Sequence, residues 1–526
     1  MPEYLSPGVY VEEFEIGAKP IEGVSTSTAG FLGETLRGPL YPRFITGFEQ
    51  FKRIYGGYLN NNRFLAYAID GFFSNGGQRC FVGRIVGENA ETTLATHDTI
   101  TIKAIGPEAW GNRIAIKISE GSLQDPDAPE PWEKIKLTVM YWDEAPPTPL
   151  VDPTDPNEAT NPNRRSPSLL EVYDNLSADP TSIDYLETRV NNSSNLIILD
   201  HTNDTNPEQL ALTLLPDLAD ATNGVDGDTP TVDQYKGKIL DALPDGTIHK
   251  SGLLGFEQID EISLVIAPNH HAVETLDMEL VKHCTLQGDR FTILHSNPAT
   301  DTINNISTIR PPQDTTYAAF YFPWIKIFDP RTNQDYRIPP SGHVAGIYAK
   351  TDVERGVHKA PANVVVLGAT SLEFQIIKRD QDMLNPRGVN CLRAFPGRGI
   401  RVWGARTSSS NTLWKYINVR RLFLFIEESI EEGTQWVVFE PNDQKLWARV
   451  RQTITQFLTT VWRNGALMGA TAEEAFFVKC DRTTMTQDDI DNGRLICIIG
   501  VAPVKPAEFV IFRITQFSGG SEVAEL

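Results

Sequence analysis

Apolar residues recur along the chain with two periods, and these periods predict alternating strands and helices. The run ISLVIAP at 262–268 is short and almost wholly apolar, and so is RFTIL at 290–294. Between them, residues 271–287 have the longer mixed pattern of a helix. Strand, helix and strand in this order predict a βαβ unit. The expected fold class is therefore α/β, with a core of mixed sheet flanked by helices.

The same patterns predict the rest of this core. Two short helices with aromatic faces are expected at 48–55 and 64–73. Short apolar runs predict further strands at the start of 28–39 and at 80–86, 195–200, 318–322, 364–367 and 496–501.

From residue 99 the pattern becomes rich in strands. Apolar runs bounded by Gly or Pro occur at 100–105, 114–118 and 134–142, and a proline-rich polar stretch that is typical of a loop follows at 143–167. We interpret residues 95–195 as an inserted, outward-facing β-rich domain, because additions at a surface cross no interface. A disordered spacer is the alternative, and it fits only the proline-rich half.

Two long helices are predicted near the end of the chain. The earlier one, around 413–433, is apolar over much of its circumference, so we expect it to be buried in a large core or between subunits. The later one has a single apolar face, with residues at steps of three and four: Leu446, Val450, Ile454, Phe457, Leu458, Val461 and Trp462.

Both ends of the sequence carry strand-like segments without an obvious partner. One is the short pattern Val9–Glu12, which lies among prolines and glycines. The other is EFVIFRITQF at 508–517, where both faces are apolar, and such a strand invites aggregation unless a partner covers it. The expected division of the chain is an N-terminal linking arm at 1–25, a core at 26–94 and 196–505 interrupted by the insertion at 95–195, and a C-terminal linking arm at 506–526.

Composition limits the classes of function. The 526 residues are 40% hydrophobic, which is enough for two or three domains with sizeable cores. No apolar run approaches the roughly 20 residues that cross a bilayer, and Met1 is followed by Pro and Glu rather than by a signal segment, so we expect synthesis in the cytoplasm and no membrane insertion. The five cysteines form no CxxC pair and are interpreted as small buried apolar residues.

The charge of the chain is unevenly distributed. A net charge of −21 argues against nucleic-acid binding, which needs an excess of Lys and Arg. Residues 384–426, however, contain no Asp or Glu and form a cationic island, whose members are Arg387, Arg393, Arg398, Arg401, Arg406, Lys415, Arg420 and Arg421. Pairing with carboxylates of the same core is one interpretation. Contact with acidic groups of another molecule is the other.

Enzyme chemistry finds little support in the sequence. His270 and His271 are too far along one helix from His283 and Cys284 to share a metal. The acidic stretch 220–228 lacks the spacing of a calcium loop, and no GxxxxGK[ST] phosphate loop occurs. His343 and His358 have no accompanying nucleophile motif and are interpreted as residues that hydrogen-bond turns. We therefore expect no catalytic site, no cofactor and no metal.

The most specific signal is a set of ordered blocks between residues 317 and 422, rich in Gly, Pro, Trp and Arg. They are YFPW (321–324), PPSGHVAG (339–346), GVHKAPAN (356–363), LNPRGVNC (384–391), WGART (403–407) and WKYINVRRL (414–422), with PEYLSPGVYVEEFE (2–15) before them and AFFVKCDRTTM (475–485) and GVAPVKPAEFVIFRITQ (500–516) after them. Together they resemble the contractile tail sheath proteins, the family that forms the sleeve of contractile phage tails, R-type pyocins and extracellular contractile injection systems.

The resemblance implies a structural subunit and not an enzyme. It implies a homo-oligomer of stacked rings, with six-fold symmetry expected, in a helical sheath that surrounds an inner tube, meets baseplate and tail terminator proteins, and contracts to drive the tube through a target envelope. The sheath would be part of a phage tail or a phage tail-like particle. A non-polymerising sheath terminator, or another structural part of the same particle, is the alternative.

The resemblance also assigns candidate residues. The terminal arms would link neighbouring subunits by adding a strand to a partner's sheet, through Val9, Tyr10, Val11, Glu12, Phe509, Val510, Ile511, Phe512, Ile514 and Phe517. Candidate charge contacts with the tube or with another subunit are Arg398, Arg401, Arg406, Lys415, Arg420, Arg421, Glu427, Glu428, Glu431 and Glu432.

Overall fold

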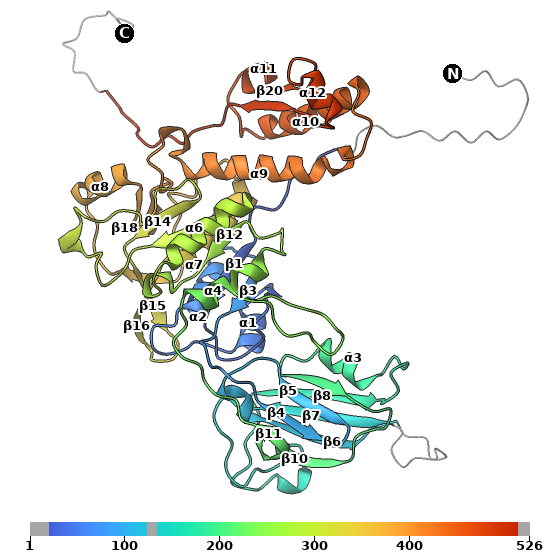
Figure 1. The fold of residues 1–526 in the computed structure, drawn as a ribbon. Coiled ribbons are helices and arrows are strands. Elements are labelled where there is room, and N and C mark those ends of the chain that lie inside the picture. Colours follow the sequence, from blue (N-terminus) through green and yellow to red (C-terminus); the bar gives the residue numbers. More distant parts are fainter. Residues whose placement is uncertain (1–19, 124–133, 514–526) are drawn as a thin grey trace, which may run out of the picture.

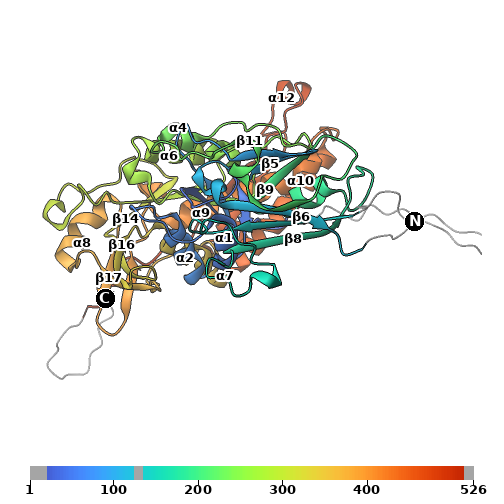
Figure 2. The same ribbon diagram turned by 90° about the horizontal axis from the view of Figure 1, so that it is seen from below.

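A computed structural model describes residues 20–123 and 134–513 of the chain. The molecule is elongated (Figure 1): an α/β core lies in the middle, with a β-sandwich at one end and a helix-rich C-terminal domain at the other. Seen from the sandwich end, α8 (Lys378–Leu384) and a small sheet project to one side of the core (Figure 2). This three-stranded sheet has the order β16-β15-β17. Its strands are β15 (Ile325–Asp329), β16 (Gln334–Ile338) and β17 (Ala369–Leu372).

The core is built on an eight-stranded mixed sheet with the order β19-β18-β14-β13-β12-β1-β3-β2. The strands are β1 (Ala29–Gly33), β2 (Arg43–Ile45), β3 (Cys80–Arg84), β12 (Leu264–Ile266), β13 (Phe291–His295), β14 (Ala318–Phe322), β18 (Val389–Phe395) and β19 (Gly399–Trp403). Neighbours from β3 to β18 run parallel, and β2 and β19 are antiparallel at the edges. The predicted α/β class with a mixed sheet is confirmed.

Helices cover both faces of this sheet, which explains why its strands are almost wholly apolar. Along β12, Leu264 and Ile266 belong to the same buried cluster as Val344 of α7, whereas Val265 belongs to the cluster of Leu280 of α6. The helices of the first face are α1 (Phe48–Tyr55), α2 (Leu65–Ser74) and α7 (Ser341–Arg355), and those of the second are α4 (Val232–Lys236), α5 (Gly252–Phe256) and α6 (Leu276–Gln287).

The inserted domain is a sandwich of two four-stranded sheets, with the orders β10-β6-β7-β8 and β11-β4-β5-β9, around one apolar cluster. Its elements are β4 (Leu94–His97), β5 (Ile100–Ala104), β6 (Ile114–Glu120), β7 (Ile135–Tyr141), β8 (Leu169–Leu176), α3 (Leu186–Asn191), β9 (Ile197–His201), β10 (Leu210–Leu214) and β11 (Ala219–Thr222). The predicted end at residue 195 is therefore too early. Strand β9 pairs with β5 and not with the core sheet, and an apolar run alone cannot say which sheet it joins.

Two buried arginines join the insertion to the core. The Arg84 guanidinium donates to the carbonyl oxygens of Gly38 (2.9 Å) and Pro107 (3.1 Å), and it forms an ion pair with Glu108. Arg37 forms an ion pair with Asp143 at 3.2 Å. Since Pro107, Glu108 and Asp143 belong to the insertion, these bonds fix the base of the sandwich on the core.

The C-terminal domain has an apolar cluster of its own. It contains α9 (Ile417–Gly433), α10 (Gln444–Arg463), α11 (Ala472–Ala475), β20 (Phe476–Lys479), α12 (Gln487–Asp491) and β21 (Ile498–Val501). Both long helices are confirmed, and the predicted apolar face of α10 lies in this cluster. The expectation of one continuous core over 196–505 is wrong, because β21 pairs with β20 in a separate two-stranded sheet.

Two predicted strands are not found. Residues 364–367 contain no strand and make a single bridge, Val365 to Arg401. Residues 508–513 also have no strand, although their sequence favours one. A β-prone segment forms a strand only when another strand offers it hydrogen bonds, and this segment meets none among the described residues.

Three histidines form a hydrogen-bonded chain at the carboxyl ends of β12 and β13. His270 Nε2 lies 3.1 Å from His295 Nδ1, and His271 Nδ1 lies 3.2 Å from His295 Nε2. Each ring nitrogen of His295 therefore already faces another imidazole, and the rings do not converge on one metal position. Burial lowers the pKa of His270 to about 3 and that of His271 to about 4, and burial with the neighbouring histidines holds the pKa of His295 well below its ordinary value.

These pKa shifts predict an acid-sensitive core. Below about pH 6.5 the unfolded chain takes up protons on these imidazoles before the folded chain does, so their contribution to stability is present above that pH and is lost progressively towards about pH 4. We expect His271→Gln to reduce the fall in the urea midpoint between about pH 7.5 and about pH 5. His97→Gln, at the partly exposed end of β4, is the control and should leave the fall unchanged. An equal fall in His271→Gln and wild type would contradict the argument.

Candidate functional site

The residues predicted to link subunits lie at the two ends of the chain. Val9, Tyr10, Val11, Glu12, Ile514 and Phe517 are outside the described residues. Phe509, Val510, Ile511 and Phe512 are described, and their exposed fractions are 71%, 69%, 80% and 83%. Such exposure of four consecutive apolar side chains indicates a surface that needs a partner. The candidate site consists of the two segments that attach these chain ends to the rest of the molecule. We call residues 20–28 the N-terminal root and residues 504–510 the C-terminal root.

The N-terminal root runs along α9, antiparallel to it. Ile21 packs in the apolar cluster of the C-terminal domain and touches Gly433 at the last turn of the helix. The backbone N–H of Val24 donates to Ser429 Oγ at 3.1 Å. Gly23 lies so close to the helix that a Cβ atom there would be 2.8 Å from the Phe425 ring, so only glycine permits this approach.

A buried ion pair holds the inner end of this root. Arg421 donates to both carboxylate oxygens of Asp352, from Nη1 to Oδ1 at 3.0 Å and from Nη2 to Oδ2 at 2.7 Å. Both side chains are 3% exposed. Arg421 Nη2 also donates to the Thr26 carbonyl oxygen at 2.8 Å, and Thr26 Oγ1 donates to Asp352 Oδ2 at 2.8 Å. The pair thus joins α7, α9 and the N-terminal root at one point.

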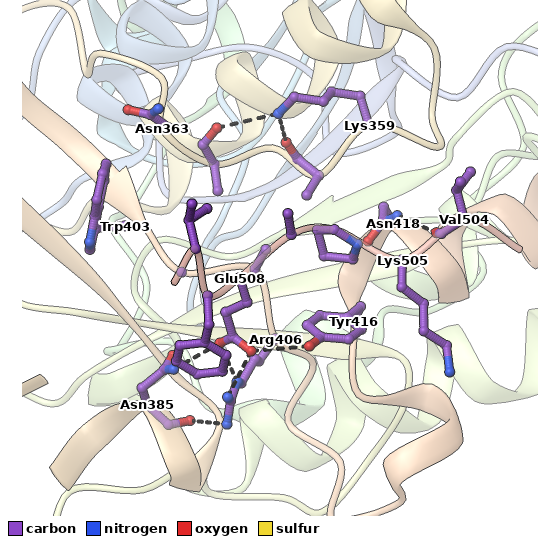
Figure 3. A pocket seen from close by; sticks show the side chains of 18 of the residues that line it. Lys359, Asn363, Asn385, Trp403, Arg406, Tyr416, Asn418, Val504, Lys505 and Glu508 are labelled. Carbon is purple, nitrogen blue, oxygen red and sulfur yellow. Dashed lines mark hydrogen bonds and ion pairs between the residues drawn. The ribbon is translucent and has the colours of Figure 1, made fainter. Parts of the chain in front are cut away.

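A second forked ion pair holds the C-terminal root (Figure 3). Arg406 donates from Nε to Glu508 Oε1 at 2.7 Å and from Nη2 to Oε2 at 2.8 Å. Asn385 Nδ2 donates to Oε1 at 2.8 Å, and Tyr416 Oη donates to Oε2 at 3.1 Å. Lys415 Nζ lies 3.4 Å from Oε2. One carboxylate therefore connects the root to the loop before β18, the loop after β19 and the start of α9.

The charge state of this clamp follows from its surroundings. Burial alone would raise the pKa of the Glu508 carboxyl, but the hydrogen bonds from Arg406 and Asn385 and the charges of Arg406 and Lys415 lower it to about 2. Glu508 is thus ionised at neutral pH. Its contribution to stability is present above about pH 4.5 and is lost as the pH falls towards about 2.

The N-terminal root follows most of α9, and the C-terminal root meets the start of this helix. The N-terminal root meets the helix from Gly433 back to Arg421, and the C-terminal root meets Tyr416 just before the helix begins. A helix of 17 residues is about 25 Å long. Asn418, in the first turn, donates from Nδ2 to the His358 carbonyl oxygen at 2.8 Å and to the Val504 carbonyl oxygen at 3.1 Å, so the helix also holds the core. α9 is the common support of both terminal segments.

A groove of about 1150 Å³ lies beside the C-terminal root, and the root itself forms one of its walls (Figure 3). Its lining is strongly cationic in a chain whose net charge is −21. The cations whose ammonium or guanidinium groups pair with no carboxylate of the described residues are Arg355, Lys359, Lys378, Arg393 and Lys505. Of the two acidic residues in the lining, Glu508 is already engaged by Arg406 and the other is Asp382.

The predicted charge contacts separate into two groups. Arg406, Arg420, Arg421 and Lys415 make contacts within the chain, so the interpretation that island arginines pair inside their own core fits these four. Arg421 forms its ion pair with Asp352 of α7. Arg420 reaches Glu427 at 3.6 Å, but it is also held by the Tyr317 hydroxyl at 2.7 Å and lies over the Tyr317 ring.

The remaining predicted charges are accessible. Arg398 is exposed in the β18–β19 turn, and Arg401 donates from Nη1 to the Asn363 carbonyl oxygen at 2.8 Å. Glu427, Glu431 and Glu432 are exposed on α9. Glu428 is half-buried, and burial together with the nearby charges of Asp289 and Glu432 raises its pKa to about 8.

A possible acceptor for a strand lies in the same domain. The two-stranded sheet β20–β21 is joined at neither outer edge by another strand of the described residues. Phe476, Val478 and Ile499 face the apolar cluster below it, whereas Phe477 is 57% and Ile498 47% exposed on the other side. A sheet of two strands is marginal by itself, so this surface can gain both hydrogen bonds and apolar contacts from an added strand.

Sequence patterns alone could not find Asp352, Glu508 or Lys378. Each lies far along the chain from the cation or groove that gives it a role, and a single carboxylate or lysine has no periodicity. The charge island did indicate the region, since Arg406 and Arg421, the two anchoring arginines, belong to it.

Family comparisons agree with this arrangement. The model of the phage tail sheath protein central domain matches residues 253–408, and that of the phage tail sheath C-terminal domain matches residues 409–517, so that the two together cover half of the chain. The chain belongs to the phage tail sheath family. Its junction between the two family domains falls just before α9, and the C-terminal match includes the C-terminal root.

Individual members of the sheath family are distant. The tail sheath protein of Vibrio phage KVP40 is 26% identical over 216 residues, which are 40% of this chain and 31% of that protein. The tail sheath protein of Burkholderia phage BcepMu is 30% identical over 157 residues, 28% of this chain and 33% of that protein. A putative prophage major tail sheath protein of Pseudomonas aeruginosa is 27% identical over 198 residues, 36% of this chain and 49% of that protein. The matches thus span a third to a half of these relatives.

Solved sheath structures share the fold over nearly the whole chain. The helical sheath of the anti-feeding prophage in its contracted state has a TM-score of 0.56 and 24% identity, and it covers 97% of this chain and 99% of that chain. The sheath complex of the extracellular contractile injection system PVC, in its contracted state, has a TM-score of 0.56 and 23% identity, and covers 98% and 99%.

The described residues show neither a metal cluster nor a membrane-spanning helix. Within residues 20–123 and 134–513, no three or more His, Cys, Asp or Glu side chains are placed to hold a metal ion. No helix in these same ranges is long and apolar enough to cross a membrane.

The N-terminal anchor predicts a large loss of stability when one partner is removed. Arg421→Met leaves the Asp352 carboxylate buried without its counter-charge, and we expect a cost of about 3–5 kcal/mol in the free energy of unfolding. The double variant Arg421→Met/Asp352→Leu removes both charges and should recover a large part of this loss. Urea unfolding measures both. A cost below about 1 kcal/mol for Arg421→Met would contradict a structural role for the pair.

The C-terminal anchor predicts a local effect. Glu508→Gln removes the charge that Arg406 and Lys415 hold, so the C-terminal root should detach and chymotrypsin should cleave faster after Phe509, with the rest of the chain intact. Glu354→Gln removes a carboxylate from an exposed pair with Lys350 and is the matched control. Mass spectrometry of timed digests gives the rates. Equal rates for Glu508→Gln and wild type would contradict the clamp.

Proposed function

We propose that this chain is a subunit of a contractile sheath, which polymerises around an inner tube and shortens to drive the tube through a target envelope. The observation that carries the proposal is the pairing of two anchored roots with an exposed apolar segment. Residues 509–512 leave a rigid attachment and expose four apolar side chains in succession. A monomer gains nothing from this arrangement, whereas a polymer does.

The link between subunits would be an added strand. Residues 508–513 have the composition of a strand and lack a partner within the described chain, and the β20–β21 sheet has free edges. We propose that the C-terminal arm of one copy, and by the same logic the N-terminal arm around Val9–Glu12, joins this sheet in another copy. An arm and an acceptor sheet are different surfaces, so the contact is heterologous and propagates into rings or a helix.

Contraction requires subunits that move while their links persist. Both roots are held by forked, charge-assisted pairs, which are the strong class of side-chain hydrogen bonds. The segments outside the roots would then act as hinges between bodies that stay rigid, with the sheath passing between two packings of the same subunits. On this proposal α9 transmits force from one arm to the other through about 25 Å of helix.

Charge would add specificity to these contacts. The groove cations Lys378, Arg393 and Lys505 have no carboxylate partner among the described residues, and neither do Arg398 in the β18–β19 turn and Arg401 on β19. We propose that they meet acidic groups of a neighbouring subunit or of the tube. Contact with another molecule is therefore proposed only for the accessible cations of the island, whereas its buried arginines pair within their own chain.

The other partners follow from the family. Two solved relatives come from the anti-feeding prophage, one from its baseplate and one from its contracted helical sheath. We propose the same setting here: a phage tail or tail-like particle, assembled in the cytoplasm, in which the sheath meets an inner tube, a baseplate and a terminator.

Removal of the C-terminal arm tests the linking role. A chain ending at Pro506 lacks both Glu508 and the exposed apolar segment, so it should fold but form no cylinders in negative-stain microscopy, where the full chain forms long hollow ones. Circular dichroism and thermal unfolding check the fold. Cylinders of normal length from the truncated chain would refute the arm argument.

A matched variant separates the arm from its anchor. Ile511→Asp with Phe512→Asp keeps Glu508 and the chain length but makes the segment unfit for an apolar interface, so it should also fail to polymerise. If the full-length wild-type chain forms single rings and never cylinders, it is a terminator and not the main sheath subunit.

A further inference from the structure

The five cysteines include one pair that lies face to face. All five are free thiols, and Cys80, Cys284 and Cys391 are each enclosed in the apolar clusters of the core. Cys480 and Cys497 are different: they follow β20 and precede β21 directly, they belong to the same apolar cluster, and each thiol influences the pKa of the other. Nothing in the sheath function proposed above requires two thiols at this place.

The register of the hairpin makes them cross-strand partners. Phe476 is opposite Val501 and Lys479 is opposite Ile498, where the ladder ends, and the same register carried one residue further brings Cys480 opposite Cys497. Side chains alternate along each strand, and those of Phe476, Val478 and Ile499 face the apolar cluster. Cys480 and Cys497 have the same parity and face the same way, which agrees with their place in that cluster.

The hydrogen-bond pattern places the two thiols as close as a sheet allows. The N–H of Ala502 donates to the Ala475 carbonyl oxygen at 2.8 Å, which identifies Ala475 and Ala502 as a hydrogen-bonded pair. Hydrogen-bonded and non-hydrogen-bonded pairs alternate along an antiparallel ladder. Five steps further, the position of Cys480 and Cys497 is that of a non-hydrogen-bonded pair, for which Cα atoms are typically about 4.5 Å apart and side chains are nearest. This separation lies within the range of disulfides, about 4.4–6.8 Å between Cα atoms.

We propose that Cys480 and Cys497 are a redox site that closes to an intramolecular disulfide and staples the loop 481–496 to the base of the β20–β21 sheet. The oxidant would be a peroxide. Attack of the Cys497 thiolate on one peroxide oxygen forms a sulfenic acid and releases water or an alcohol, and attack of Cys480 sulfur on the sulfenic sulfur forms the S–S bond and releases water. The two thiols together lose two electrons and two protons, and the peroxide is reduced.

Burial sets the rate and the order of attack. Cys497 is partly exposed and Cys480 is buried, so Cys497 is the sulfur that a small oxidant reaches first. Burial, and the neighbouring Cys480, raise the pKa of Cys497 to about 12, so that only a small fraction is thiolate at neutral pH. The site should therefore respond slowly, and its rate should rise with pH.

Closing the pair would change the acceptor sheet itself. The loop 481–496 carries α12, and within it Thr484 Oγ1 donates to the Ile496 carbonyl oxygen at 2.8 Å. A disulfide at 480–497 would fix the end of the hairpin that this loop enters and leaves. The inference stands without the sheath function, because it concerns the chemistry of one chain.

The test uses the full chain, reduced and then exposed to hydrogen peroxide, with thiols counted after denaturation. We expect two of the five thiols to be lost, a peptide that joins residues 480 and 497 to appear by mass spectrometry without reductant, and dithiothreitol to reverse the change. The rate should rise about tenfold per pH unit between about pH 7 and about pH 9, because the thiolate is the nucleophile.

Variants distinguish this site from general oxidation. Cys497→Ser should give no linked peptide, whereas Cys284→Ser should still give it and still lose two thiols. If Cys497→Ser proves unstable, Cys480→Ala replaces it as the test variant and should likewise give no linked peptide. Retention of all five thiols by the folded chain would overturn the proposal, and so would a disulfide between other cysteines or between two chains. Failure of the truncated chain to polymerise has no bearing on this outcome, so the two proposals can fail separately.

Discussion

The attachment of the two terminal segments around α9, each through a forked arginine–carboxylate pair, is the constraint on which this structure depends. Arg421 with Asp352 fixes the N-terminal root, and Arg406 with Glu508 fixes the C-terminal root. The first pair is buried, so its value lies in geometry more than in net stability: a buried ion pair holds a unique arrangement and is costly to break. The second is partly open to solvent and borders the cationic groove.

These two anchors explain how three domains with separate apolar clusters are connected to both terminal segments. The sandwich, the core and the C-terminal domain have separate apolar clusters, yet α7, α9 and both roots meet around the anchors. On the proposed function, a load applied to one terminal segment would reach the other through α9 and would not need to cross the sandwich. The inserted domain lies outside this path (Figure 1), and its size can vary without effect on the links.

The sequence predicted the elements well and their partners poorly. Strong periodicity identified α10 and the βαβ unit of β12, α6 and β13, because local spacing determines such elements. Apolar runs could not show that β9 belongs to the sandwich or that residues 508–513 lack a strand, since pairing depends on what lies opposite. The charge island indicated the right region, but the division between buried anchors and accessible contacts depends on Asp352 and Glu508, which are distant along the chain.

The central claim is that an anchored terminal segment of one copy completes the β20–β21 sheet of another. A cryo-electron microscopy reconstruction of the assembled chain, at a resolution that traces the backbone, tests it most directly. The account predicts residues 508–513 of one copy as a strand hydrogen-bonded to β20 or β21 of a different copy, with Glu508 still on Arg406 of its own chain. A C-terminal segment that folds back onto its own subunit, with β20–β21 left as two strands, would contradict the account.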